Sequence, residues 1–192
     1  MRTRTGYRKL CKRYDEPGHA HYLTFSCFRN QPFLEGDRAR QWFVSALAEA
    51  KRKHPFCLWA WVIMPEHVHL LIYPREAVRI SEILSATKTP VAKTAAGWVR
   101  REAPQFVPRM LDIQPSGRRF IRFWQRGGGY DRNIWSVQEV HEKIKYIHNN
   151  PVRRELVAAP GDWTWSSFRA WEHSIDDPIP IDRDTLPLMK DV

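Results

Sequence analysis

Two runs of apolar, β-branched and aromatic residues, 56–64 and 67–73, are separated in the sequence only by Pro65 and Glu66. Residues of these types are enriched in β-strands. A connection of two residues joins antiparallel neighbours through a tight turn, which proline favours. We therefore predict that this part of the chain forms a β-hairpin.

The remaining elements follow from the spacing of apolar residues along the chain. In chain order they are a strand at 19–28, a helix at 37–53, a helix from about Ser81 to Arg101 interrupted near Pro90, a loop at 102–119, a short strand at 120–125 and a helix that begins at Ser136. The order β-α-β-β-α-β-α predicts an α+β fold. We expect a ferredoxin-like or RRM-like sandwich, in which an antiparallel sheet carries its helices on one face.

The last of these helices is the best defined. Ser136 and Glu139 have the spacing of a capping box, and the helix ends at residue 149 or 150, before Pro151. Tyr146 and Asn150 lie one turn apart and can point to the same place. Two interpretations stay open at this point. Tyr146 is either a functional side chain or a boundary aromatic with a buried ring and a wet hydroxyl, in which case Asn150 is a plain helix stop.

Charge is distributed unevenly over the 192 residues. The net charge is +10, but residues 174–192 carry five acidic and two basic side chains, so this tail is −3 and the rest of the chain +13. A basic surface attracts polyanions because binding releases counterions, so nucleic acid is one interpretation and a merely basic surface is the other. We divide the chain into a basic N-terminal arm at 1–18, a folded domain at 19–173 and an acidic tail rich in proline and aspartate at 174–192.

The three cysteines, Cys11, Cys27 and Cys57, show no CxxC spacing, which argues against a disulfide framework and a zinc ribbon. No apolar stretch approaches the roughly 20 residues that a membrane span requires. We expect a cytoplasmic protein with reduced thiols and no membrane partner.

His67 and His69 lie two residues apart on the second strand of the hairpin. Alternate residues of a strand point to the same face, so both imidazoles project from one surface and Val68 from the other. Two neutral imidazoles on a rigid strand form half of a divalent-metal site. The alternative is an incidental pair, because this spacing alone is not specific.

Several sequence blocks together resemble the REP-associated tyrosine transposases, which belong to the single-tyrosine HUH transposases. In chain order the blocks are Tyr22-Leu23-Thr24-Phe25, residues 61–72, Phe123-Trp124-Gln125-Arg126, residues 146–152 and residues 162–168. The resemblance extends from about residue 19 to residue 171, and the joint occurrence of the blocks is specific. One departure is Gly127-Gly128-Gly129, where the family usually has bulkier residues. We therefore expect a more mobile loop before Tyr130.

The resemblance implies that His67 and His69 bind a divalent metal, Mg²⁺ or Mn²⁺, that Tyr146 is the nucleophile, and that Asn150 is the third metal ligand. Imidazole suits Mn²⁺ better than Mg²⁺. The implied reaction is metal-dependent cleavage and rejoining of single-stranded DNA at hairpin, REP-like palindromic DNA, through a 5′-phosphotyrosine and a free 3′-OH. Tyr130 is the alternative nucleophile, but it precedes the capped helix and has no ligand partner one turn further on.

Arginines and aromatic residues interleave at 118–126. Guanidinium groups bind phosphates and aromatic rings stack on bases, as single-strand binding requires. We predict DNA contacts by Arg118, Arg119, Arg122, Arg126 and Trp124. For Phe123 and Trp124, packing in the core is an equal alternative, and we expect the aromatic residues of 162–168 to pack. A further hypothesis is that the acidic tail folds back over this basic surface.

The sequence leaves other functions open. A catalytically silent protein of the same fold would bind DNA hairpins without cutting them, although the joint presence of two histidines, Tyr146 and Asn150 favours activity. An RNA-binding protein would be expected to have an aromatic RNP-type strand motif, which the sequence lacks. A metal hydrolase that activates water would stay active after Tyr146→Phe. Monomer and homodimer both stay open, as do the target DNA sequence and the general base.

Overall fold

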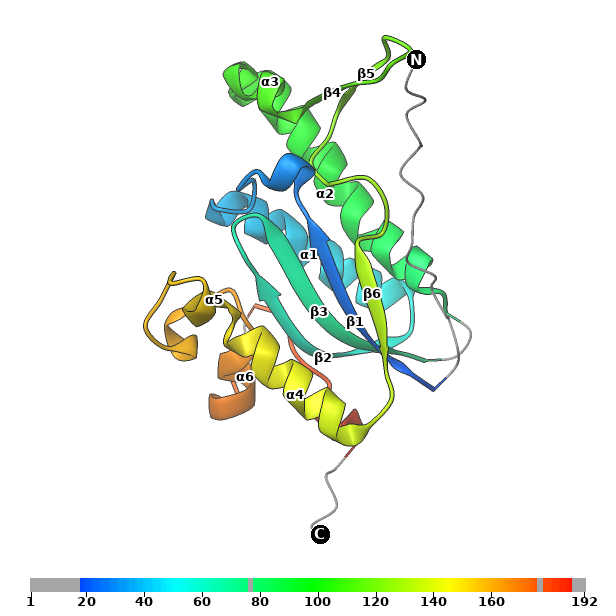
Figure 1. Cartoon of the computed structure of the whole chain (residues 1–192), viewed down its shortest axis with the longest axis vertical. Helices are drawn as coiled ribbons and strands as arrows, with labels where there is room; N and C mark the ends of the chain where they lie inside the picture. Colours follow the sequence, from blue (N-terminus) through cyan, green and yellow to red (C-terminus); the bar gives the residue numbers. More distant parts are fainter. Residues whose placement is uncertain (1–17, 76–77, 176–177, 188–192) are drawn as a thin grey trace, which may run out of the picture.

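The computed structural model describes residues 18–75, 78–175 and 178–187 (Figure 1). Its centre is a four-stranded sheet with the order β2-β3-β1-β6, in which all neighbours run antiparallel. The strands are β1 (Ala20–Ser26), β2 (Phe56–Ile63), β3 (His67–Pro74) and β6 (Tyr130–Ile134). The predicted hairpin and the α+β fold are thus confirmed. The predicted basic arm, apart from Gly18, lies outside the described residues.

Helices and a smaller sheet surround this centre. The helices are α1 (Asp37–Lys53), α2 (Ile80–Glu102), α3 (Val107–Met110), α4 (Val137–His148), α5 (Asn150–Arg153) and α6 (Phe168–His173). Short 3-10 turns lie at Phe28–Asn30, Pro104–Phe106, Pro160–Asp162 and Arg183–Thr185. Strands β4 (Leu111–Ile113) and β5 (Arg119–Ile121) form a separate hairpin that projects beyond the main sheet (Figure 1).

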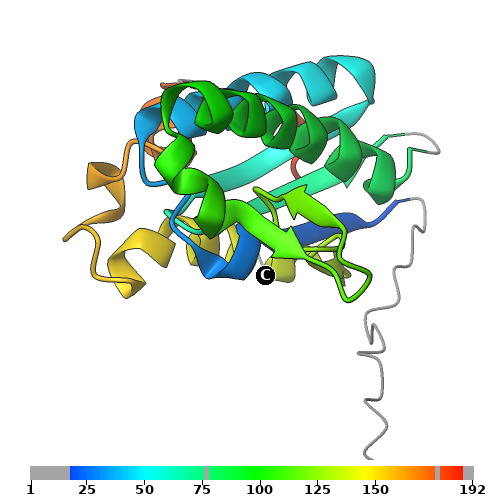
Figure 2. The same cartoon turned by 90° about the horizontal axis from the view of Figure 1, so that it is seen from above.

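Helices cover both faces of the sheet, not one (Figure 2). α1 and α2 lie over one face and α4 over the other. Side chains of β1 alternate accordingly: Leu23 and Phe25 join the core of the first face, whereas Ala20 and Tyr22 join the core of the second. The expectation of a one-sided sandwich was wrong, because strands that are apolar on both sides must be covered on both sides.

α2 runs through Pro90 without the predicted interruption. A proline inside a helix removes one backbone hydrogen bond and normally kinks or ends the helix. Here Pro90 is exposed, while Leu84 before it and Val91 after it are buried in the core shared with α1. Packing of both halves of α2 against α1 therefore offsets the missing bond.

The fourth strand of the main sheet is β6 and not the predicted strand at 120–125. β6 has the polar sequence YDRNI, so it lacks the apolar alternation that marks a strand. Its pairing is instead stabilised by the buried contact between Asp131 Oδ1 and His21 Nδ1, 2.8 Å apart on neighbouring strands. Residues 120 and 121 of the predicted 120–125 strand belong to β5, which pairs with β4. The predicted loop at 102–119 contains ordered structure, because α3 and β4 lie within it.

Residues 178–187 of the acidic tail lie along β2. Ile179 and Ile181 are buried in the core, and the Asp182 carboxylate accepts a hydrogen bond from the backbone N–H of Leu58 at 2.7 Å. The Lys51 ammonium pairs with the same carboxylate at 2.8 Å. These residues do not fold back over the arginines of 118–126, so that hypothesis was wrong for residues 178–187.

Among the described residues, none of the helices has the length and apolar character needed to cross a membrane.

Candidate active site

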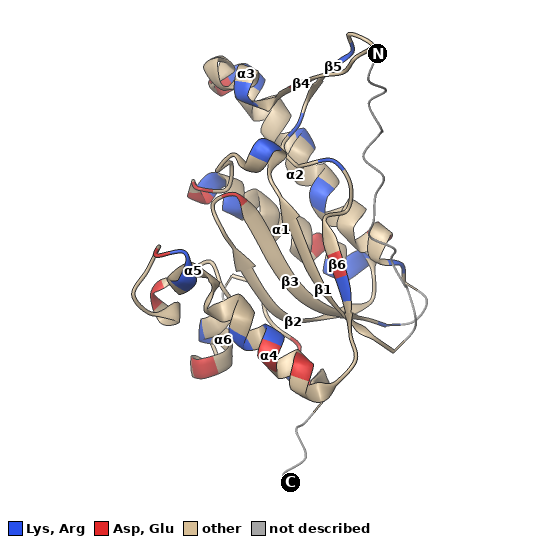
Figure 3. Ribbon diagram, in the orientation of Figure 1, with Lys and Arg blue, Asp and Glu red and all other residues tan. Residues whose placement is uncertain are grey.

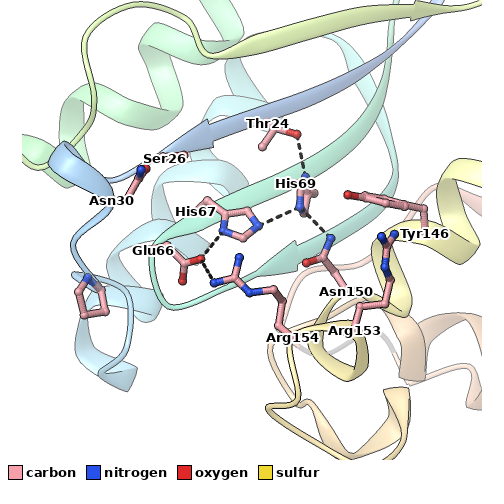
Figure 4. A pocket seen from close by; sticks show the side chains of 11 residues that line it. Thr24, Ser26, Asn30, Glu66, His67, His69, Tyr146, Asn150, Arg153 and Arg154 are labelled. Carbon is pink, nitrogen blue, oxygen red and sulfur yellow. Dashed lines mark hydrogen bonds and ion pairs between the residues drawn. The ribbon is translucent and has the colours of Figure 1, made fainter.

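A cavity of about 680 Å³ opens where β1 and β3 meet α4 and α5 (Figure 4). Its walls are formed by Thr24, Ser26, Asn30, Pro32, Glu66, His67, His69, Tyr146, Asn150, Arg153 and Arg154. The predicted nucleophile and all three predicted metal ligands are therefore in one place. The fold brings the end of one strand next to the junction of two helices that lie about 80 residues away in the sequence.

His69 is held by hydroxyl groups of β1. β1 and β3 pair so that Thr24 lies opposite His69, and the His69 Nδ1 atom lies 2.7 Å from both Thr24 Oγ1 and Tyr22 Oη. Burial, with a smaller effect of His67, lowers the pKa of His69 to about 3. The imidazole is therefore neutral at physiological pH, which is the state that a metal ligand requires.

His67 is oriented by a carboxylate. Its Nδ1–H donates to Glu66 Oε1 at 3.1 Å, and Glu66 also pairs with Arg154 Nη2 of the α5 C-cap at 2.8 Å. Burial lowers the pKa of His67, although the neighbouring Glu66 opposes this effect. The neutral ring with its proton on Nδ1 presents the lone pair of Nε2 to the cavity.

Asn150 reaches the same point from the helix junction. α4 ends at His148 and α5 begins at Asn150, with Pro151 in the first turn of α5, where the lack of an N–H costs nothing. The Asn150 Nδ2 atom lies 3.0 Å from His69 Nε2. Amide nitrogen and oxygen are interchangeable by a flip of the side chain, so Oδ1 can take the same position.

Tyr146 projects from α4 toward the histidine pair. Its ring centroid lies 5.8 Å from that of His69 and 6.0 Å from that of Tyr22, edge to face in both cases. Tyr130, the alternative nucleophile, is 50% exposed on β6 and does not line the cavity. The geometry therefore favours Tyr146 over Tyr130.

The cavity residues fit a divalent cation. The Nε2 atoms of His67 and His69 lie 2.9 Å apart, and two ligands at right angles on an octahedral ion with bonds of about 2.1 Å lie roughly 3.0 Å apart. Two imidazole acceptors this close repel each other unless a proton or a cation lies between them. No group of three His, Cys, Asp or Glu side chains suited to a metal occurs within the described ranges, so the candidate centre depends on the Asn150 amide as its third ligand.

Several residues of the site were not predicted from the sequence. Tyr22 and Thr24 lie at alternate positions of β1, and Glu66 lies in the turn, but their contacts with the histidines depend on strand register. Arg153 and Arg154 line the cavity although the sequence offered no pattern for them. The alternation of Tyr22 and Thr24 was the one signal available, because it places both side chains on one face of the strand.

The predicted DNA-binding residues divide into two groups. Arg118 and Arg119 are exposed near the tip of the β4–β5 hairpin. Arg122 and Arg126 instead pair with the carboxylate of Asp112. All four remain on a surface distinct from the cavity walls.

Trp124 packs in the core. It is only 6% exposed, its ring lies edge to face with Phe25 at 5.2 Å, and its Nε1–H donates to the Lys88 carbonyl at 3.0 Å. The ring is therefore not available to stack on a base, and the core alternative is correct for this residue. Trp163 and Trp165 also pack as expected, with their indole N–H groups donating to Ile63 and Asp37.

A family model described as "Transposase IS200 like" matches residues 17–150 of the chain. The match contains the whole four-stranded sheet, the histidine pair, Tyr146 and Asn150. This match places the chain in the class of transposases. The chain belongs to the IS200-like transposase family.

Individual relatives agree with this assignment. The chain is 29% identical over 131 residues to a protein of Haemophilus influenzae named as a REP-associated tyrosine transposase, with 66% of each chain covered. It is 25% identical over 132 residues to the REP-associated tyrosine transposase of Escherichia coli K12, covering 64% of this chain and 61% of the relative. The chain thus spans about two thirds of the length of these curated relatives.

A solved structure of a REP-associated tyrosine transposase bound to a REP hairpin shares the fold. It matches with a TM-score of 0.67 and 22% identity over 91% of this chain and 92% of that chain. The resemblance to REP-associated tyrosine transposases that the sequence blocks predicted is confirmed.

Proposed function

We propose that this protein cuts and rejoins single-stranded DNA beside a hairpin, using Tyr146 as a nucleophile that becomes linked to the 5′ phosphate. The observation that carries the proposal is the position of Tyr146, which lines the same cavity as the predicted metal ligands. The family assignment supports the reaction class, because transposases break and join DNA strands. The REP hairpin bound by the solved relative supports a hairpin substrate.

The chemistry of the proposed step is a transesterification. The phenolic oxygen of Tyr146 attacks the scissile phosphorus and the bond from phosphorus to the 3′ oxygen breaks. The phenolic proton passes to the solvent. The leaving 3′ oxygen takes up a proton from the solvent and becomes a free 3′-OH. The phosphotyrosine conserves the energy of the broken bond, so a 3′-OH of another strand can reverse the step and complete strand transfer.

His67, His69 and Asn150 would hold the metal ion. When bound, a divalent cation stabilises the negative charge that develops on the phosphate oxygens. Imidazole nitrogen favours Mn²⁺, while Mg²⁺ prefers oxygen ligands, so both ions belong in the test. The surrounding protein keeps both imidazoles neutral and orients them through Glu66 and the hydroxyl groups of β1.

Exposed Arg118 and Arg119 would contact the DNA backbone outside the cavity. Phosphate contacts of this kind position a duplex without reading its sequence. The β4–β5 hairpin projects beyond the main sheet (Figure 3). We expect the two side chains to contact a DNA stem whose adjoining strand enters the cavity.

The test is to incubate the protein with Mn²⁺ or Mg²⁺ and end-labelled single-stranded hairpin oligonucleotides taken from the flanks of its own gene. We expect an SDS-stable protein–DNA adduct that Tyr146→Phe abolishes and that the matched variant Tyr130→Phe retains. Tight hairpin binding by the wild type without any adduct would instead support a catalytically silent binding protein. DNA cleavage that survives Tyr146→Phe would point to a metal hydrolase.

A further inference from the structure

Arg153 is the last residue of α5 and lies beside the proposed nucleophile. Its guanidinium carbon is 4.9 Å from the centre of the Tyr146 ring, and the Lys143 ammonium is 5.6 Å from the same centre. Of the two cations, Arg153 alone lines the cavity (Figure 4). The side chain therefore lies at the mouth of the space in which a scissile phosphate would contact Tyr146.

The two neighbouring arginines of this segment have different roles. Arg154 is paired with Glu66 at 2.8 Å and so takes part in holding His67. Arg153, in contrast, has no carboxylate within 4.0 Å in the part of the chain that the structure describes. Its five donors are exposed to solvent and to the cavity.

The charge balance of the cavity wall identifies the kind of ligand that Arg153 suits. Glu66 is the one acidic residue among the described lining residues, and Arg154 already neutralises it. Among the carboxylate and guanidinium groups of the described wall, Arg153 is thus the one without an ion-pair partner, which suits it to an anionic ligand.

We propose that Arg153 is a catalytic residue that binds a non-bridging oxygen of the scissile phosphate and of the resulting phosphotyrosine. The inference rests on the proposed function. It adds to the predicted metal ion a second positive group that stabilises the phosphate charge. A guanidinium presents paired donors that match phosphate oxygens, and such donors are most effective where charge develops during the reaction. Arg153 approaches from the Tyr146 side of the cavity, opposite the histidine-bearing strand.

The backbone holds Arg153 in register with the rest of the site. The Arg153 N–H donates to the Asn149 carbonyl at 2.9 Å, and the next turn is closed by the Leu156 N–H on the Pro151 carbonyl at 3.0 Å. Asn150 lies on the same short helix. The backbone positions of a predicted metal ligand and of the proposed phosphate ligand are therefore held together on one short helix.

The first experiment compares Arg153→Ala and Arg153→Lys with Arg169→Ala, which removes an exposed arginine from α6. Single-turnover adduct formation on a hairpin oligonucleotide should fall about 100-fold in Arg153→Ala, as for loss of one transition-state donor. The rate should fall less in Arg153→Lys and remain unchanged in Arg169→Ala. The hairpin affinity of all three variants should stay within about threefold of the wild-type value. An Arg153→Ala variant that reacts at the wild-type rate would overturn the proposal.

Sulfur substitution separates Arg153 from the metal. A single non-bridging phosphorothioate that replaces the oxygen bound by Arg153 should slow the wild type in Mg²⁺ and in Mn²⁺ alike, because the softer Mn²⁺ restores only a metal contact. That stereospecific effect should vanish in Arg153→Ala. A thio effect that Mn²⁺ fully relieves for both diastereomers would count against the arginine contact.

A binding measurement keeps the inference testable if the wild type forms no adduct and the proposed function fails. Titration calorimetry with phenyl phosphate, which mimics the phosphotyrosine, is performed without metal. We expect at least tenfold weaker binding by Arg153→Ala than by Arg169→Ala, a difference of about 1.4 kcal/mol. Equal binding by these two variants would reject Arg153 as the phosphate ligand, whatever the enzyme does to DNA.

Discussion

Thr24 of β1 and His69 of β3 face each other across the sheet, with Thr24 Oγ1 and His69 Nδ1 2.7 Å apart. This contact fixes the rotation of the imidazole ring and so directs Nε2 toward His67 and Asn150. A hydroxyl can donate or accept, so it suits either neutral tautomer of His69. β1 therefore orients His69, which we predict to be a metal ligand on β3.

Thr24→Val should weaken the proposed metal site while leaving the strand intact. Valine has nearly the shape of threonine but cannot hydrogen-bond His69, and loss of such an outer partner typically costs about 10- to 100-fold in metal affinity. Tyr22 retains its contact, so we expect the lower end of this range. The Mn²⁺ dissociation constant, measured by calorimetry or EPR, checks the prediction. Thr89→Val, an exposed replacement on α2, is the control.

Gly129→Ala should strongly destabilise the fold. Gly129 has a φ of +80°, and a Cβ atom there would lie 2.1 Å from the Thr24 carbonyl oxygen, so the backbone of β1 would have to move. Gly117 has a similar φ of +78° but open space around it. Gly117→Ala should cost only the left-handed strain of about 1–2 kcal/mol, and Gly129→Ala clearly more. Urea unfolding of both variants measures the difference, and equal losses would contradict it.

Acid should unfold the protein partly through His148. Burial lowers the pKa of His148 to about 4, and its Nε2 contacts Ser167 Oγ at 2.9 Å. An unfolded histidine titrates near 6.5, so between about pH 6.5 and 4 the unfolded state binds the extra proton. Stability contributed by this group is thus complete above pH 6.5 and declines as the pH falls. His148→Gln should reduce the slope of unfolding free energy against pH by up to about 1.4 kcal/mol per pH unit. An unchanged slope would show that other groups dominate.

Arg118→Ala and Arg119→Ala should each weaken hairpin binding and lower its dependence on salt. Neither side chain has a described carboxylate partner, so each is available for a phosphate. Loss of one phosphate contact reduces the slope of log affinity against log salt concentration by about 0.7–0.9. Asp112→Asn should strengthen hairpin binding and increase its dependence on salt, because it releases Arg122 and Arg126. Fluorescence anisotropy at several salt concentrations measures all three, and an unchanged slope would place the hairpin elsewhere.

The sequence predicted the elements whose side chains repeat with a clear period. The apolar periodicity of α1 gave both of its ends correctly, and the Pro65-Glu66 turn gave the β2–β3 hairpin. β6 could not be found in this way, because its buried Asp131 is paired with His21 on the neighbouring strand, and that contact exists only after the strands have paired. The same limitation explains the interruption wrongly predicted near Pro90, since α1 supplies what the local sequence lacks.

The residues of the candidate site also divide into those that the sequence could indicate and those that it could not. The spacing of His67 and His69 on a strand and of Tyr146 and Asn150 on a helix made them candidates, and the resemblance to REP-associated tyrosine transposases implied their roles. The contact of Thr24 with His69 depends on strand register, and the ion pair of Glu66 with Arg154 on the position of α5. Such contacts between distant segments leave no periodic signal in the sequence. Trp124 was wrongly predicted to contact DNA for a related reason. An aromatic residue beside arginines has the same local sequence pattern whether it is buried in the core or exposed on a DNA-binding surface.

The tail along β2 has a consequence for how copies of this protein can associate. Backbone groups on the outer side of β2 are already occupied: Leu58 by Asp182, Trp61 by Ser167 and Ile63 by Trp165. An unsatisfied sheet edge is a template for strand addition by another chain, and this edge is closed to it. A second copy of the chain therefore cannot extend the main sheet by pairing with β2 at these positions.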